Sequence, residues 1–255
     1  MLDIGAEHDL IPGPLPGERL DDLQRGSLRI LQKERGFRFG MDAVLLADFA
    51  RIHERARVAD FGTGTGILPL LLHARGKGTS FEAIELQADM ADMASRTMAL
   101  NGLSEVIRVH HARVEEADTL LGRCAVDAVV CNPPYALPGT SLRNPDDALS
   151  AARHQPEEGI GAWFRMAHLV LKGRGRLYAI YPAPRMLSLM EQLEEARLAP
   201  KAFRLVYPAA DRPANLVLVE AVKDGKPMLH PQPPLIVYEA DGSPTPELRR
   251  IYGEA

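Results

Sequence analysis

The chain has 255 residues, of which 46% are hydrophobic and 25% are charged, and its net charge at pH 7 is -4. This composition is ordinary for a globular protein, and the length is enough for one large α/β domain. No apolar run reaches the roughly 18 residues of a membrane span. Two cysteines are too few for a disulfide framework. The N-terminus lacks the pattern of a signal peptide, so we expect a cytoplasmic protein with no membrane partner.

The first 50 residues combine an irregular start with a basic segment. Residues 1–17 are rich in proline and glycine, which favours a flexible lead-in. Residues 23–40 contain five basic residues and one acidic residue, Glu34. The basic residues are Arg25, Arg29, Lys33, Arg35 and Arg38. Such a segment is typical either of a solvated surface or of a phosphate-binding one. Charge alone leaves both interpretations open.

Strand and helix patterns alternate after a short helix predicted at 41–50. Strands are predicted over 58–61, 81–86, 106–110, 126–131, 176–181, 203–207 and 216–222, and helices over 67–74, 88–100, 162–171 and 186–198. This alternation predicts a single Rossmann-like α/β domain with a mostly parallel seven-stranded sheet and helices on both faces. We expect an extension at 1–50 that packs on the domain at 51–225, and a tail at 226–255.

A glycine-rich loop joins the first predicted strand to its helix, Asp60-Phe61-Gly62-Thr63-Gly64-Thr65-Gly66. Alternating glycines let a ligand approach the backbone closely, although the pattern alone also fits a tight turn or a dinucleotide site. A carboxylate at Asp60 repels pyrophosphate but attracts an ammonium or sulfonium. Glu85, at the end of the second strand, can accept hydrogen bonds from ribose hydroxyls. S-adenosylmethionine (SAM) has this combination of groups.

The fourth predicted strand ends in Asn132-Pro133-Pro134-Tyr135. The two prolines stiffen the backbone and remove two amide donors. Asn132 offers a side-chain acceptor and Tyr135 a flat ring for stacking. The Asn132 side chain and the Pro133 carbonyl can hold both hydrogens of an exocyclic amine, so that its lone pair points at a methyl donor. The motif predicts methylation of a planar nitrogen.

The remaining candidate groups give weaker signals. Eight histidines occur without metal-ligand spacing, so we expect no metal site. Cys131 is interpreted as a buried structural thiol. Trp163 is expected in the core. Arg143 and Arg153 lie in a polar segment after the reacting loop, where they either contact RNA phosphates or are solvated.

With both motifs present, residues 58–222 resemble the Asn-Pro-Pro-Tyr class of SAM-dependent methyltransferases. A narrower resemblance, over about residues 18–253, is to the bacterial family that methylates adenine N6 in valine tRNA, next to the anticodon. It rests on segments 18–23, 30–32, 37–47, 235–238 and 247–253. The resemblance implies SAM as cofactor, tRNA or another structured RNA as partner, and methyl transfer to adenine N6.

The same resemblance implies roles for individual residues. The catalytic group is Asn132, Pro133, Pro134 and Tyr135. The cofactor-binding group is Asp42, Asp60, Phe61, Gly62, Gly64, Gly66, Glu85, Leu86, Ala112, Arg113 and Asn132, with Leu46 lining the pocket. The substrate-binding group is Tyr135, by the resemblance, together with four residues proposed from their charge alone: Arg29, Arg38, Arg143 and Arg153. One position departs from the family pattern: Arg113 stands where an aspartate usually contacts the cofactor's adenine, so that contact would depend on backbone groups near Ala112.

Several alternatives remain open. The same reacting motif serves enzymes that methylate a glutamine amide in release factors, but those usually carry a helical domain ahead of the glycine loop, where this chain has about 57 residues. Adenine in ribosomal RNA or DNA is another substrate, although the length leaves no room for a large DNA-recognition domain. Without such a domain, a flipped or unpaired base is expected. A SAM-binding RNA scaffold is the non-enzymatic alternative, which the intact Asn132 and Tyr135 argue against.

Overall fold

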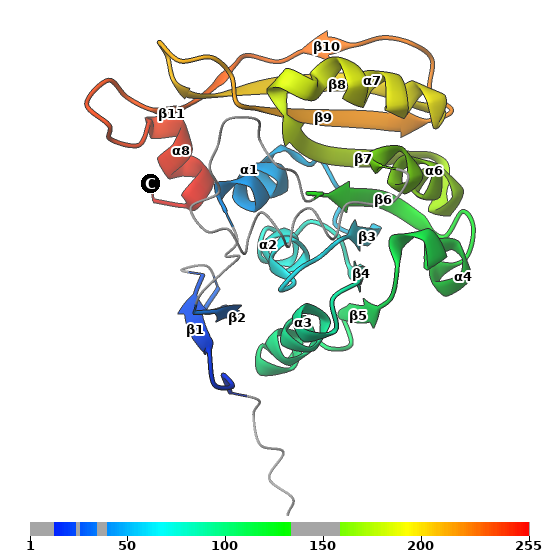
Figure 1. Ribbon diagram of the computed structural model, residues 1–255, viewed down its shortest axis with the longest axis vertical. Coiled ribbons are helices and arrows are strands. Elements are labelled where there is room, and N and C mark those ends of the chain that lie inside the picture. The colour runs from blue at the N-terminus through cyan, green and yellow to red at the C-terminus, as the bar shows by residue number, and fades with distance from the viewer. Residues whose placement is uncertain (1–12, 24–25, 35–39, 134–158, 255) are drawn as a thin grey trace, which may run out of the picture.

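A computed structural model of the protein describes residues 13–23, 26–34, 40–133 and 159–254. Within these residues nine strands form one sheet in the order β10-β8-β9-β7-β6-β3-β4-β5, and β11 pairs with β8 (Figure 1). The strands of this sheet are β3 (Arg57–Phe61), β4 (Ser80–Glu85), β5 (Ile107–His111), β6 (Val126–Cys131), β7 (Leu171–Pro182), β8 (Leu198–Ala209), β9 (Leu216–Lys223), β10 (His230–Pro231) and β11 (Leu235–Tyr238). The strands from β3 to β7 run parallel, and β9 runs antiparallel to both its neighbours.

Helices cover both faces of this sheet, so the Rossmann-like fold predicted from the sequence is confirmed. Within the described residues the sheet has nine strands where seven were predicted, because the segment at 226–255, predicted as a tail, supplies β10 and β11. The helices are α1 (Met41–Phe49), α2 (Ile67–Ala74), α3 (Ala88–Leu100), α4 (Ala117–Leu121), α6 (Ile160–Val170), α7 (Met186–Glu195) and α8 (Pro246–Tyr252), with short 3₁₀ turns η1 (Val114–Glu116) and η2 (Ala183–Arg185). Each face has its own apolar cluster: one draws on α1, α2 and α8, the other on α4, α6 and α7. None of the helices in these ranges is long and apolar enough to cross a bilayer.

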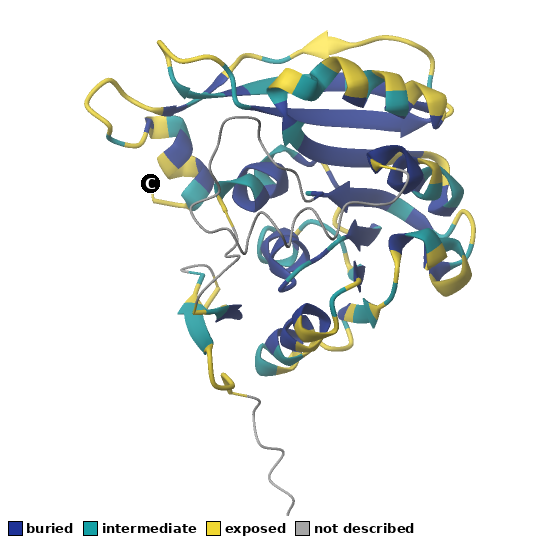
Figure 2. Ribbon diagram, in the orientation of Figure 1, coloured by how far each residue is buried: buried dark blue, intermediate teal, exposed yellow. Residues whose placement is uncertain are grey.

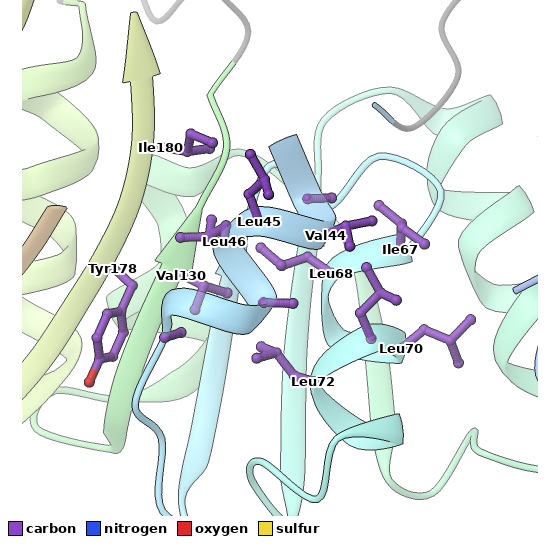
Figure 3. Packing of buried hydrophobic residues seen from close by; sticks show 14 of the residues in the cluster. Val44, Leu45, Leu46, Ile67, Leu68, Leu70, Leu72, Val130, Tyr178 and Ile180 are labelled. Atoms are coloured by element: carbon purple, nitrogen blue, oxygen red, sulfur yellow. The ribbon is translucent and has the colours of Figure 1, made fainter. Parts of the chain in front are cut away.

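The first apolar cluster is built where α1 packs on α2 and the sheet. Figure 3 shows Leu45 and Leu46 of α1 between Leu68 of α2 and Val130 of β6. All four side chains are almost completely buried. Figure 2 shows the same pattern across the molecule, with β9 and the centre of the sheet buried. Burial of this much apolar surface is the main favourable term for the fold.

The strand order reverses direction between β3 and β6. From β3 the chain continues outward through β4 and β5, and from β6 it continues outward on the other side through β7. Open parallel sheets bind ligands beyond the carboxyl ends of their strands at such a reversal. The loops after β3, β4 and β6 therefore lie at the expected ligand-binding edge.

The N-terminal hairpin was not predicted from the sequence. It comprises β1 (Glu18–Asp22) and β2 (Arg29–Lys33), a separate two-stranded sheet that lies against α3 (Figure 1). Ile30 and Leu31 are fully buried, and the Leu31 amide donates to the Thr97 hydroxyl at 3.1 Å. Arg96 of α3 binds both carboxylate oxygens of Glu18, at 2.6 and 2.8 Å. The hairpin is thus docked on the domain.

The C-terminal residues extend the same fold. β10 and β11 both pair with β8, and α8 packs against α1 through Leu248 and Ile251. Arg75, which directly follows α2, binds Asp48 at 3.0 Å and the Ile251 carbonyl at 2.7 Å, which fixes α8 beside α1. The segment predicted as a tail therefore contributes to the sheet and to the core in this structure.

Candidate active site

Three adjacent strand ends bring the main predicted site residues to one edge of the sheet. Phe61, the last residue of β3, pairs with Ile84 of β4 and with Cys131 of β6. Glu85 and Asn132 therefore stand on either side of Gly62. Because neighbouring strands are about 4.8 Å apart, the backbones at these two positions are separated by roughly 10 Å. A ligand placed over Gly62 can contact both.

The glycine loop has a backbone that only glycine adopts without strain at three positions. Gly62, Gly64 and Gly66 have φ values of 73°, 59° and 83°, all in the left-handed region. A Cβ at Gly66 would lie 2.4 Å from Met98 Cε, the flexible end of that side chain, so the left-handed φ is the stronger reason for glycine there. At Gly64 a Cβ would meet only Met90 Cε, at 3.8 Å. The Gly64 backbone is thus open to a close ligand.

Glu85 is held in place by the backbone. It ends β4 with only 6% of its surface exposed, and its two carboxylate oxygens accept hydrogen bonds from the Gly64 amide at 2.8 Å and the Gln87 amide at 2.9 Å. Each oxygen has further lone pairs for ligand hydroxyls. The next residue, Leu86, exposes 43% of its surface, an apolar face beside the acid.

Three buried polar atoms of this loop lack partners within the described structure. They are Asp60 Oδ2, Thr63 Oγ1 and Thr65 Oγ1. Buried polar groups are nearly always hydrogen-bonded, so a cluster of unsatisfied ones indicates a missing ligand. Burial raises the pKa of Asp60 to about 7. The neighbouring Thr63 hydroxyl offsets part of this rise, and the charge of Glu85 adds to it. A cationic ligand group would relieve this penalty.

These groups fit SAM. An ammonium can pair with Asp60, ribose hydroxyls can bind Glu85, and the open Gly64 backbone admits the ligand closely. Thr63 and Thr65 were not predicted as site residues. Their position between glycines was the available signal, but only the fold reveals that their hydroxyls are buried.

The other predicted cofactor-binding residues differ in their exposure and in their contacts with the site. The Ala112 amide donates to the Glu85 carbonyl at 3.0 Å, which brings the loop after β5 to the site. Arg113 is exposed, with its Nε 3.6 Å from Glu115 Oε2. Asp42 is half-buried in the first turn of α1. Phe61 and Leu46 are fully buried core residues.

The reacting loop begins where the described structure ends. Asn132 is half-buried and Pro133 buried at the end of β6. Desolvation raises the pKa of the Cys131 thiol, which is fully buried, so this group stays protonated and structural as predicted. Arg29 is exposed on β2. The other predicted residues lie outside the described residues: Pro134, Tyr135, Arg38, Arg143 and Arg153.

A second cluster of charge lies nearer the opposite end of the sheet. Glu82 binds Arg57 at 2.8 Å and His110 Nε2 at 2.7 Å, and these partners lower the pKa of this buried carboxylate. In the part of the chain that the structure describes, no group of three or more His, Cys, Asp or Glu side chains is arranged to hold a metal ion.

Comparison with known proteins finds similarity to methyltransferases. Residues 40–155 match the family model of the methyltransferase small domain. The chain is 29% identical over 183 residues to the tRNA1(Val) (adenine(37)-N6)-methyltransferase of Parabacteroides distasonis, covering 71% of this chain and 75% of the relative. It is 25% identical over 205 residues to the enzyme of the same name from Pedobacter heparinus, covering 80% and 85%.

Solved structures give the same fold. A crystal structure described as a predicted O-methyltransferase from Agrobacterium tumefaciens aligns with a TM-score of 0.67 and 25% identity, over 84% of this chain and 96% of that one. TYW2 of Pyrococcus horikoshii, solved with MeSAdo, aligns with a TM-score of 0.58 and 13% identity, over 82% and 72%. The latter likeness concerns the fold alone.

The sheet order and the groups at its ligand-binding edge define a class I methyltransferase. The chain is a SAM-dependent methyltransferase with this fold, and its sequence is similar to those of bacterial tRNA1(Val) (adenine(37)-N6)-methyltransferases.

Proposed function

We propose that this enzyme transfers a methyl group from SAM to N6 of an adenine in tRNA, and that it acts in the cytoplasm on adenine 37 of valine tRNA. The observation that carries the proposal is the position of Asn132 and Pro133, one strand away from the Asp60 loop. Amide and carbonyl acceptors beside a SAM site suit an amine that must be oriented. The names of the relatives support adenine as the carrier of that amine.

The chemistry follows from the groups on this chain. Bound SAM supplies an electrophilic methyl on a sulfonium. Asn132 and the Pro133 carbonyl accept the two amine hydrogens and direct the nitrogen lone pair toward that methyl. As the nitrogen–carbon bond forms, the carbon–sulfur bond breaks, and the cationic product releases one proton to water. A buried thiol at Cys131 takes no part, because it stays protonated.

The hairpin supports the RNA part of the proposal. β2 carries Arg29 on its exposed side, while its buried residues Ile30 and Leu31 are fixed against the domain. A cation on a docked hairpin is suited to contact phosphates while the target base enters the site unpaired.

Two other acceptors compete with adenine in RNA. A glutamine amide in a protein has the same pair of hydrogens and would also suit Asn132. Adenine in DNA presents the same N6 amine. The relatives' names and the basic segment at 23–40 favour tRNA over both.

The test is to incubate the enzyme with methyl-labelled SAM and separate samples of total tRNA, ribosomal RNA, DNA and protein. Digestion to nucleosides or amino acids identifies the product. We expect N6-methyladenosine from the tRNA sample. Label found chiefly in methylglutamine, or in DNA, would replace this proposal with one of the alternatives.

A further inference from the structure

The only tryptophan of the chain packs against the cofactor loop. Trp163 lies on α6, and only 7% of its surface is exposed. Its ring meets the ring of Phe61 edge to face, with the centroids 6.5 Å apart and the planes at 88°. A Cβ at Gly62 would lie 2.6 Å from Trp163 Cη2 and 3.2 Å from Cζ3. The indole therefore rests directly on the Gly62 backbone.

Two helices thus contact the glycine loop through different residues. Trp163 of α6 meets Gly62, while Met90 and Met98 of α3 meet Gly64 and Gly66. A bulky, rigid ring leaves Gly62 no room to relax from its left-handed conformation, with φ at 73°. The backbone that precedes the unpaired Thr63 hydroxyl is held from the α6 side before any ligand binds.

We propose that Trp163 is a positioning residue of the cofactor site, which holds Gly62 and the end of β3 in the conformation that binds SAM. The argument concerns cofactor binding and is independent of which acceptor is methylated. Without the indole, the loop gains alternative conformations. The free energy needed to order the loop then reduces the binding free energy of SAM. SAM affinity therefore falls when the ring is made small, beyond any loss of stability.

The matched control is the next residue of the same helix. Phe164 is fully buried in the same apolar cluster, but the three atoms nearest to a Cβ at Gly62 all belong to Trp163. We would compare Trp163→Leu, Trp163→Phe and Phe164→Leu by calorimetric titration with S-adenosylhomocysteine, at a temperature where each is folded. Trp163→Leu should raise Kd by about tenfold or more, Trp163→Phe should recover part of the loss, and Phe164→Leu should stay within about twofold.

Equal Kd values for Trp163→Leu and the wild type would overturn the proposal, as would an equal rise in the Phe164→Leu control. A second measurement needs no variant. Because Trp163 is the sole indole, the emission of the unmodified protein should change on titration with S-adenosylhomocysteine, with a midpoint equal to the calorimetric Kd. Emission that stays constant at saturation would also rule the proposal out.

Discussion

The Gly64 amide donates a hydrogen bond to Glu85 Oε2 at 2.8 Å, so the glycine loop of one strand is tied to the acid that ends the next. The second oxygen of Glu85 is held by the Gln87 amide at the start of α3. These contacts fix the carboxylate before a ligand arrives. Preorganised acceptors of this kind bind without having to be ordered at the moment of association.

Glu85→Gln should therefore weaken cofactor binding. The substitution removes the charge and turns one accepting oxygen into a donor, which faces a backbone amide. Since a hydrogen bond to a charged group contributes about 1.5–3 kcal/mol, the Kd for S-adenosylhomocysteine should rise roughly 10- to 100-fold in calorimetric titrations.

Glu82→Gln is the matched control, because Glu82 is as deeply buried on the same strand but pairs with Arg57 and His110. This variant should lose stability and keep the wild-type Kd once folded. If Glu85→Gln and Glu82→Gln lost affinity equally, the loss would come from distortion of β4 as a whole and not from the missing Glu85 carboxylate.

Asp60 should make SAM binding depend on pH near neutrality. Its pKa in the cofactor-free protein is about 7, so the carboxylate that attracts the ligand's cation is progressively protonated below that pH. SAM affinity in the wild type should fall as the pH is lowered from about 8 to 6, whereas Asp60→Asn should bind weakly with a flat profile. A wild-type profile that is equally flat would contradict this role.

The same residue should destabilise the cofactor-free protein at high pH. The folded pKa of about 7 lies above the ordinary aspartate value of 3.8, so the folded state holds the proton more tightly. Its contribution to stability is present at low pH and is lost as the pH rises from about 4 to about 7. At pH 8, Asp60→Asn should be more stable than the wild type by roughly 2–4 kcal/mol in urea unfolding. If Asp60→Asn were instead less stable than the wild type, the Asp60 carboxylate would have to be stabilised by hydrogen-bond partners in the folded protein.

The parallel core could be predicted from the sequence because its signals are local. The strand at 126–131 and the helix at 88–100 have the bounds predicted, since an apolar run ends at Asn132-Pro133 and an amphipathic pattern ends at Asn101-Gly102. Other strands are longer than predicted, because polar residues interrupt their apolar runs. β8 begins at Leu198, where its antiparallel pairing with β9 begins, and β7 begins at Leu171, which pairs with Val126 of β6.

Features that depend on tertiary contacts could not be predicted. The hairpin sequence has few apolar residues, and its burial comes from α3, a partner distant in sequence. The hydroxyls of Thr63 and Thr65 are equally typical of an ordinary turn. Only the fold places them beside Asp60 without partners.

Arg96→Ala should loosen the hairpin. The Arg96–Glu18 pair is largely buried, with 16% and 11% of the side chains exposed, and it lowers the pKa of Glu18. Losing it should destabilise hairpin docking by about 1–3 kcal/mol, seen as faster hydrogen exchange at the Leu31 amide. Arg55→Ala, at an exposed ion pair, should leave that exchange rate unchanged.

Arg29→Glu should weaken tRNA binding and flatten its salt dependence, because a phosphate contact is replaced by repulsion. The hairpin should stay docked, since Arg29 contacts Asn101 through its backbone amide and carbonyl. Arg108→Glu is the control. Arg108 is exposed near the start of β5, at the end of the strand that lies away from the ligand-binding loops. Equal losses in both variants, measured by filter binding at several salt concentrations, would refute a specific role for the hairpin.

The most direct test of methyl transfer at Asn132 is single-turnover methylation of a valine tRNA transcript by the wild type and by Asn132→Ala, with the Kd for S-adenosylhomocysteine measured on both. The account predicts that the rate of N6-methyladenosine formation falls by about 100-fold or more while the Kd changes by less than about threefold. An Asn132→Ala enzyme that methylates the transcript at the wild-type rate would contradict it.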